Sequence, residues 1–323
     1  MVIVTSEKPL VSIIINCYNG DKYLKEAINS IYNQSYHNWE IIFWDNQSTD
    51  QSANIAKSFN EKLKYFYAPN HTPLGEARNE AVKVTNGDFI AFLDCDDLWL
   101  PEKLDLQIKK INSGNYSMCY GGCIQIDENG NRIRSLIPKY NDGNMFEDLL
   151  FQWDISMASI LVKKSDLERL KLNFDKNIFA SADYGLCMPL AAKTNLCAVK
   201  EPIVIYRYTN DSLTSQQISK LAHERRYTLD KVIRENPGIE KKYKKGFDEA
   251  YARSYYYEAN YFMSIRNKKK ARNSMNKIKH LDYKYYLLFL SLFFPSFMWR
   301  FITNEKIKEK YLAYLFNITS FNK

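Results

Sequence analysis

The sequence lacks the glycine-rich loops that hold phosphates in many nucleotide-binding proteins. Only 11 of its 323 residues are glycine. Neither the dinucleotide-binding pattern nor the P-loop pattern occurs among them. A dehydrogenase of the classical type and an ATPase are therefore disfavoured.

Cysteine is also sparse. Six cysteines are scattered along the chain, and only Cys119 and Cys123 lie close together, with no second pair to complete a zinc site. This distribution indicates reduced thiols in a cytosolic protein rather than a disulfide framework. Because the amino terminus has no basic segment followed by an apolar one, we expect no secretory signal.

No apolar run is long enough to span a bilayer. The run at 285–294 is shorter than the about 20 residues that a spanning helix needs, and Pro295 interrupts it. Aromatic residues and lysines flank it, as in segments that lie in the headgroup region of a membrane. The alternative is a buried helix in a small helical core.

Positive charge is concentrated in the last third of the chain. Residues 1–219 carry 22 Lys and Arg against 27 Asp and Glu, whereas residues 220–323 carry 23 against 10. A basic region on a mildly acidic body indicates an anionic partner surface, either a membrane or a nucleic acid.

Strand and helix patterns alternate through the first 111 residues. Short apolar runs predict buried strands at 10–15, 39–44, 63–67 and 89–93. Helical spacing of apolar residues follows the first three, at 24–31, 53–59 and 74–84. This alternation predicts an α/β protein with a Rossmann-like, mostly parallel sheet that is flanked by helices on both faces.

Polar clusters follow three of these strands, at residues 16–19, 45–50 and 94–97. Ligands bind beyond the carboxyl ends of the strands in such sheets, so we expect the clusters to meet there. The third cluster contains Asp94, Asp96 and Asp97, and such oxygen ligands suit Mg²⁺ or Mn²⁺. The alternative is an acidic turn that caps a helix beginning at Pro101.

The remainder of the chain divides at about residue 219. Before that point the pattern is less regular, with strands expected at 118–126, 155–162 and 199–206, and helices at 165–170 and 180–192. Beyond it the pattern is wholly helical, including a helix pair at 251–263 and 268–278. We therefore predict a catalytic domain at 1–219, with halves at 9–111 and 112–219, and a helical basic extension at 220–323.

Five segments of the first hundred residues carry a family resemblance, and they occur in order at 11–19, 30–36, 40–50, 77–79 and 87–101. These segments resemble the family 2 inverting glycosyltransferases with the GT-A fold, of the type that builds bacterial surface polysaccharides. The resemblance implies a GT-A fold and a glycosyltransferase of the hexosyltransferase type.

The resemblance also implies a nucleotide site at the first two polar clusters. Asn16 and Tyr18 match donor-binding positions, and Asp45 matches an aspartate that accepts a hydrogen bond from the base. A carboxylate suits this role because a pyrimidine imide offers an N–H donor. The chain departs from many relatives at Asn46, where they have aspartate, and at Gln47, where they have glycine.

The diphosphate and metal positions follow in the third cluster. Arg78 matches an arginine near the base and diphosphate, although it could instead pair with Asp94. Asp94 and Asp96 match the family's DxD motif, with Asp96 as the direct ligand of Mg²⁺ or Mn²⁺. Such a metal would neutralise charge on the leaving nucleotide.

The catalytic base is expected downstream. Asp183 matches the aspartate that deprotonates the acceptor hydroxyl, while Ala182 replaces its usual glutamate neighbour. The alternative for Asp183 is a plain helix N-cap. Arg207 resembles a diphosphate contact or is a surface residue, and Thr209 stands where relatives often have histidine.

The sequence thus predicts transfer of a sugar from a nucleotide-diphosphate sugar, most simply a UDP-sugar, to an acceptor hydroxyl of a lipid-linked or surface glycan precursor. We expect a cytoplasmic protein that is peripheral at the inner face of the cell membrane. One alternative is a metal-dependent nucleotidyltransferase, which the lack of Lys and Arg at 16–20 disfavours. The other is a non-catalytic protein that binds membrane or nucleic acid through the basic residues at 266–279.

Overall fold

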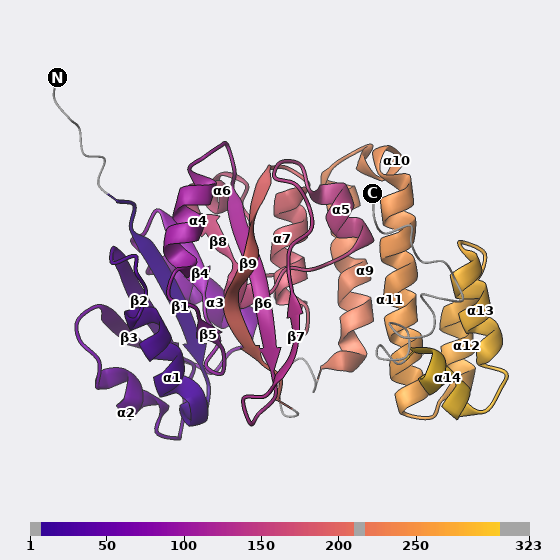
Figure 1. The fold of residues 1–323 in the computed structure, drawn as a ribbon, viewed down its shortest axis with the longest axis horizontal. Coiled ribbons are helices and arrows are strands. Elements are labelled where there is room, and N and C mark those ends of the chain that lie inside the picture. The colour runs from indigo at the N-terminus through magenta and orange to yellow at the C-terminus, as the bar shows by residue number, and fades with distance from the viewer. Residues whose placement is uncertain (1–7, 210–216, 304–323) are drawn as a thin grey trace.

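The described residues form a nine-stranded sheet with helices on both faces and a helical extension at one end (Figure 1). The computed structural model describes residues 8–209 and 217–303. The strands are β1 (Val11–Cys17), β2 (Trp39–Asp45), β3 (Leu63–Tyr67), β4 (Phe89–Phe92), β5 (Leu98–Trp99), β6 (Met118–Ile126), β7 (Arg132–Leu136), β8 (Leu161–Lys163) and β9 (Leu196–Arg207).

The sheet has the order β3-β2-β1-β4-β8-β6-β9-β5, with β7 paired to β6. The first four strands are mutually parallel, as predicted, and β6 and β9 are also parallel. Strand β8 is antiparallel to both β4 and β6, and β5 is antiparallel to β9. Parallel neighbours need crossover connections, which helices supply in the first half of the chain.

The helices that accompany the sheet are α1 (Asp21–Tyr32), α2 (Ser52–Lys57), α3 (Leu74–Lys83), α4 (Lys103–Ile111), α5 (Phe146–Phe151), α6 (Lys164–Arg169) and α7 (Ala182–Ala191). Successive side chains of a strand point to opposite faces. Accordingly, Ile14 of β1 belongs to one core cluster, with α3 and α7, whereas Ile13 and Ile15 belong to another, with α1 and α4. The two cores confirm the predicted double covering.

The predicted strand at 155–162 is mostly wrong. Only its end belongs to β8, and a short 3₁₀ helix, η1 (Met157–Ser159), precedes that strand. The reason is local, because the backbone N–H and the hydroxyl of Ser159 both donate to the Ser156 carbonyl, at 3.0 and 2.8 Å. Hydrogen bonds between residues so close in sequence compete with strand pairing.

The extension is helical, as predicted. It contains α9 (Ile218–Glu235), α10 (Ile239–Lys242), α11 (Lys244–Ser264), α12 (Lys268–Asn276), α13 (Tyr283–Ser291) and α14 (Ser296–Thr303). Its first part is continuous with the body, because Leu229, Val232 and Phe247 join the same core cluster as α7. Helices α12 to α14 instead form a separate cluster with α11, around Met275 and Trp299. Within the described residues, no helix has both the length and the apolar character needed to cross a membrane.

Candidate active site

The carboxyl ends of β1, β2 and β4 lie together at one edge of the sheet. Parallel pairing sets Cys17 beside Asp45 and Ile14 beside Phe92. The three polar clusters that follow these strands therefore converge, as the sequence predicted.

Asp45 ends β2 and is fully buried. Its Oδ1 accepts the Ser48 backbone N–H at 2.7 Å, and its Oδ2 accepts the Tyr65 hydroxyl at 2.5 Å. Burial and this carboxylate raise the pKa of Tyr65. Asp45 thus holds its own loop, and its contact with a nucleotide base stays a prediction. Tyr65 carried no signal in the sequence, because it lies in the middle of an ordinary strand pattern.

Asn16 and Tyr18 follow β1. Both polar atoms of the Asn16 side chain are buried, and neither has a hydrogen-bond partner among the described residues. Leaving such groups unpaired costs about 1–3 kcal/mol, so buried polar atoms without partners are uncommon. Tyr18 is exposed, and its ring centroid lies 4.3 Å from that of His71. Asn16 is the residue of this edge whose geometry best suits a ligand contact.

Arg78 of α3 pairs with Asp94, with 2.6 Å between Nη2 and Oδ1. The arginine side chain is 4% exposed and the aspartate side chain 38%. The guanidinium carbon also lies 5.5 Å from the centroid of the Phe174 ring. The pairing that was an alternative for Arg78 is therefore present, and the more exposed Asp94 remains open to a ligand.

Asp96 and Asp97 continue the acidic turn. Burial, reinforced by the charge of Asp94, raises the pKa of Asp96 to about 6. Asp97 is buried, which raises its pKa well above its usual range, and its Oδ1 accepts the Arg207 backbone N–H at 3.0 Å. The turn therefore concentrates negative charge that its surroundings compensate only in part.

The alternative that this turn caps the next helix is wrong. Helix α4 begins at Lys103 rather than at Pro101. Its Leu104 N–H donates to Oε1 of Gln34 at 3.1 Å, so a side-chain amide from the loop after α1 accepts a hydrogen bond from this helix terminus.

Arg207 lies at the end of β9, against the acidic turn. Its Nε donates to the Asp96 carbonyl at 3.2 Å, and its Nη2 lies 3.2 Å from Oε2 of Glu26. The guanidinium carbon is 4.1 Å from the centroid of the Tyr23 ring. Because its side chain is only 7% exposed, the surface alternative is wrong. Its contact with a diphosphate stays a prediction.

The acidic turn suits a metal that is shared with a substrate. The described residues contain no group of three or more His, Cys, Asp or Glu side chains that could enclose an ion. Asp94 and Asp96 nevertheless offer two carboxylates, and Mg²⁺ is commonly bound by one or two carboxylates together with substrate phosphates. Burial is the main cause of the raised pKa of Asp96 and the charge of Asp94 adds to it, and a divalent cation would stabilise both carboxylates in their ionised form. These residues fit the predicted ion.

Asp183 lies in the first turn of α7 and is half-buried. Its Oδ2 accepts the indole N–H of Trp153 at 3.2 Å, and its Oδ1 accepts the Tyr184 N–H at 2.7 Å. Burial raises the pKa of Asp183, while the charges of Arg225 and Arg78 oppose the rise. Arg78 therefore lies within electrostatic reach of both Asp94 and Asp183. The N-cap of α7 is Ser181, so the plain N-cap alternative for Asp183 is wrong.

Two residues near Asp183 were missed by sequence reasoning. Trp153 donates to its carboxylate, and the guanidinium carbon of Arg225 of α9 lies 4.9 Å from the centroid of the neighbouring Tyr184 ring. Both are distant from Asp183 in sequence and belong to no motif, so only the fold brings them together.

A Rossmann-like sheet with polar clusters at the carboxyl edge of its parallel strands is typical of enzymes that bind ligands in the crevice at that edge. The model of the family described as glycosyl transferase family 2 matches residues 12–170. An uncharacterized glycosyltransferase of Methanocaldococcus jannaschii is 32% identical over 231 residues, which cover 69% of this chain and 79% of the relative. The chain belongs to glycosyl transferase family 2, and it is a glycosyltransferase.

Two further proteins extend the comparison. The Escherichia coli enzyme named UDP-Glc:alpha-D-GlcNAc-diphosphoundecaprenol beta-1,3-glucosyltransferase WfgD is 30% identical over 219 residues, covering 67% of this chain and 83% of WfgD. The crystal structure of residues 1–349 of Staphylococcus aureus TarS with UDP-GlcNAc superposes with a TM-score of 0.66 at 16% identity, over 94% of this chain and 91% of that one. This likeness confirms the GT-A fold. Other relatives are much longer, and the match spans 30% and 35% of two from Rickettsia.

Proposed function

We propose that the protein is an inverting glycosyltransferase that moves a sugar from a UDP-sugar to a hydroxyl of a lipid-linked or surface glycan precursor. The observation that carries the proposal is the placement of Asp183. Its carboxylate is held by Trp153 and lies within electrostatic reach of Arg78, which pairs with Asp94 at the donor edge. With the diphosphate bound at Asp94 and Arg78, Asp183 would be the nearby base that a single displacement requires.

The reaction is one in-line displacement at the anomeric carbon. The acceptor oxygen forms the new bond as the bond to the diphosphate breaks, and the acceptor proton passes to Asp183. The leaving electron pair goes to the nucleoside diphosphate, which Arg78 and Arg207 would stabilise. A divalent ion at Asp94 and Asp96 would supply further positive charge there.

The donor and acceptor classes rest on the relatives. WfgD is named for UDP-glucose and a diphosphoundecaprenol-linked sugar, and TarS was solved with UDP-GlcNAc. Asn16 and Asp45 supply amide and carboxylate groups of the kind that recognise a pyrimidine base.

The experiment measures UDP release and sugar transfer from UDP-sugars with Mn²⁺. Asp183→Asn is expected to bind UDP normally and to lose at least 100-fold in turnover, which is within the range that general base catalysis contributes. Asp166→Asn is the matched control, because Asp166 also lies in the first turn of a helix, α6. Near wild-type turnover by Asp183→Asn would remove this residue from the mechanism.

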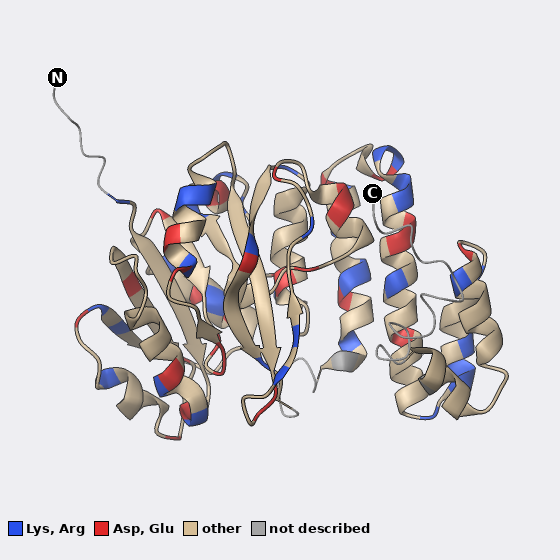
Figure 2. Cartoon of the chain, viewed as in Figure 1, with Lys and Arg blue, Asp and Glu red and all other residues tan. Residues whose placement is uncertain are grey.

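We also infer that the extension binds an anionic membrane surface. Six aromatic side chains on and beside α13 and α14 are 44–69% exposed, and together they are called the aromatic surface: Tyr283, Tyr286, Phe293, Phe294, Phe297 and Phe301. Residues 261–303 carry nine Lys and Arg against a single acidic residue, Asp282. Figure 2 places blue Lys and Arg along α9, α11 and the helices beyond them. Exposed aromatic rings among cations are typical of an interfacial segment.

A further inference from the structure

Helix α9 of the extension forms hydrogen bonds with the segment that leads to Asp183. Glu224, which is 3% exposed, directs its carboxylate at the N-terminus of α7. Its Oε1 accepts the Phe179 N–H at 2.9 Å. Its Oε2 accepts the N–H groups of Ala180 and Ser181 at 2.9 and 3.0 Å, and the Ser181 hydroxyl at 3.0 Å. One carboxylate thus receives four hydrogen bonds from three consecutive residues.

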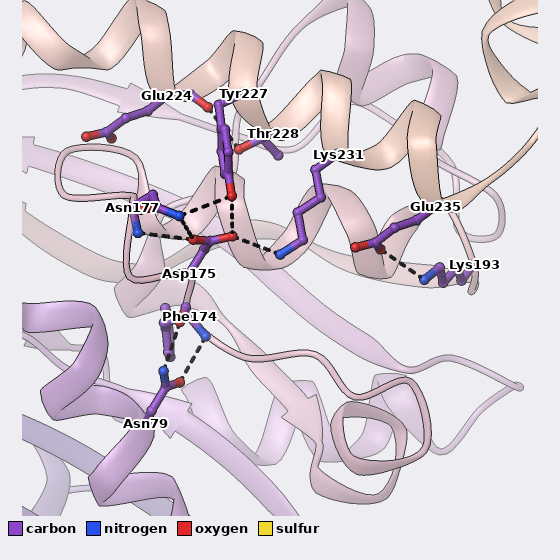
Figure 3. Close-up of polar contacts among 10 residues, drawn as sticks. All are labelled: Asn79, Phe174, Asp175, Asn177, Lys193, Glu224, Tyr227, Thr228, Lys231 and Glu235. Atoms are coloured by element: carbon purple, nitrogen blue, oxygen red, sulfur yellow. Dashed lines mark hydrogen bonds and ion pairs between the residues drawn. The ribbon is translucent and has the colours of Figure 1, made fainter.

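A second contact from α9 holds the start of the same segment. Asp175 accepts the Tyr227 hydroxyl at 3.1 Å and Nζ of Lys231 at 3.0 Å. Asn177 also donates to Asp175, through its backbone N–H at 3.0 Å and its side-chain amide at 3.1 Å. Figure 3 shows Tyr227 and Lys231 on one helix reaching Asp175 on the loop below it.

The donor half holds the other side of the segment. The amide of Asn79 makes a reciprocal pair with the backbone of Phe174, accepting its N–H at 2.9 Å and donating to its carbonyl at 2.8 Å (Figure 3). Asn79 follows Arg78 in α3. Residues 174–181, here called the base loop, are therefore fixed between α3 and α9, and they lead directly into Asp183.

The N-cap residue of α7 bonds to a distant helix instead of to α7 itself. Ser181 is the N-cap of α7, a position where serine usually accepts an N–H of its own helix. In the described structure its side chain makes no such bond to α7 and donates to Glu224 instead. Bonds to a carboxylate are about twice as strong as bonds between neutral groups. The negative charge also lies at the positive end of α7.

We propose that Glu224 is the positioning residue for Asp183. By binding the backbone from Phe179 to Ser181, it sets where the first turn of α7 presents its aspartate to the acceptor hydroxyl. This inference rests on the proposed role of Asp183 as the base. It assigns to the extension a part in catalysis, because Glu224 lies beyond the predicted end of the catalytic domain at residue 219.

The test compares Glu224→Gln with Glu235→Gln. An amide at position 224 presents an N–H₂ group toward N–H donors, so it cannot accept all four bonds. Glu235 is also on α9 and forms a more exposed ion pair with Lys193 near the other end of α7, at 3.4 Å. The two substitutions change the charge equally and both weaken contacts between α9 and the body, but only the first touches the base loop.

Glu224→Gln is expected to lower kcat at least 10-fold with the donor KM and the UDP Kd unchanged, measured well below its unfolding temperature. Ser181→Ala, which removes one of the four bonds, should give a smaller fall in kcat with little loss of stability. Glu235→Gln should keep the wild-type kcat. If Glu224→Gln fails to fold, the kcat of Ser181→Ala decides whether Glu224 positions Asp183.

Two outcomes would overturn the inference. One is a wild-type kcat for the folded Glu224→Gln and Ser181→Ala variants. The other is a fall in kcat accompanied by an equal loss of UDP affinity, which would indicate general loosening. The proposed function fails separately, since that requires near wild-type turnover by Asp183→Asn. An inactive Asp183→Asn beside a fully active Glu224→Gln would refute the positioning role alone.

Discussion

Arg78 and Asp94 join helix α3 to the end of β4 through a 2.6 Å ion pair in which the cation is buried and the anion is not. The next residue of α3, Asn79, forms two hydrogen bonds with the backbone of Phe174 at the start of the base loop. One turn of α3 thus contacts both the acidic donor edge and the segment that leads to Asp183. The two halves of the site share a structural support.

The unequal burial of this pair predicts unequal costs of removing its members. Asp94→Asn leaves a 4% exposed guanidinium without its anion and is expected to cost about 1–3 kcal/mol of unfolding free energy. Arg78→Met leaves a carboxylate that water reaches, so we expect a smaller cost. Urea unfolding measures both. Glu80→Gln, which breaks an exposed pair with Lys83 on the same helix, should change stability by less than about 1 kcal/mol. Equal costs for Asp94→Asn and Glu80→Gln would contradict this account.

Replacing Asn16 is expected to weaken nucleotide binding without lowering the stability of the fold. Its buried amide has no protein partner within the described residues, so Asn16→Ala should leave the unfolding free energy unchanged or raise it. If the amide binds the donor, the same change should weaken UDP binding about 10-fold, equivalent to about 1.4 kcal/mol. Calorimetric titration and thermal unfolding measure the two effects.

Asn46 supplies the comparison for Asn16. It is also buried, but its side chain donates to the Thr72 carbonyl at 2.7 Å and accepts the Thr72 N–H at 3.1 Å. Asn46→Ala should therefore destabilise the protein. An Asn16→Ala variant that is as destabilised as Asn46→Ala, and that binds UDP as tightly as wild type, would show that Asn16 is structural.

The donor edge was predictable because its residues follow strands that the sequence marks clearly. Strand and helix patterns that alternate along the chain imply parallel strands. Parallel pairing then places Asp45 beside the end of β1, and no knowledge of side-chain contacts is needed. The surroundings of Asp183 could not be inferred in this way. Glu224 and Trp153 lie 43 and 30 residues from their partners, Ser181 and Asp183, and occupy stretches with no motif. Long-range polar contacts of this kind depend on packing, which periodicity does not encode.

The raised pKa of Asp183 predicts how transfer depends on pH. Burial favours the protonated carboxyl, so the pH at which the base becomes active should lie above the usual value near 3.8. The bond from Trp153 favours the ionised form and lowers this pKa. Trp153→Phe should therefore move the acid limb of kcat/KM to higher pH. Trp44→Phe is the control, because the indole N–H of Trp44 is buried without a partner among the described residues. An unmoved acid limb in Trp153→Phe would count against Asp183 as the titrating group.

Membrane binding can be tested without removing the helices that carry the aromatic surface. Deleting residues after Asp282 would also remove the side chains of Tyr285, Leu292 and Trp299, which are buried in the core of the extension. The sharper variant changes only three exposed rings to serine: Phe293, Phe297 and Phe301.

Wild type should sediment with vesicles that contain phosphatidylglycerol and should bind less as salt rises, because the basic residues add an electrostatic component. Each inserted ring contributes on the order of 1–2 kcal/mol, so the triple variant should bind at least 100-fold more weakly. Ile133 and Ile137 on and beside β7 are also exposed, and their replacement by serine should leave vesicle binding unchanged. Vesicle binding by the triple variant at wild-type strength would exclude the aromatic surface as the contact. No binding by wild type would refute the proposed membrane association, leaving the transferase chemistry unaffected.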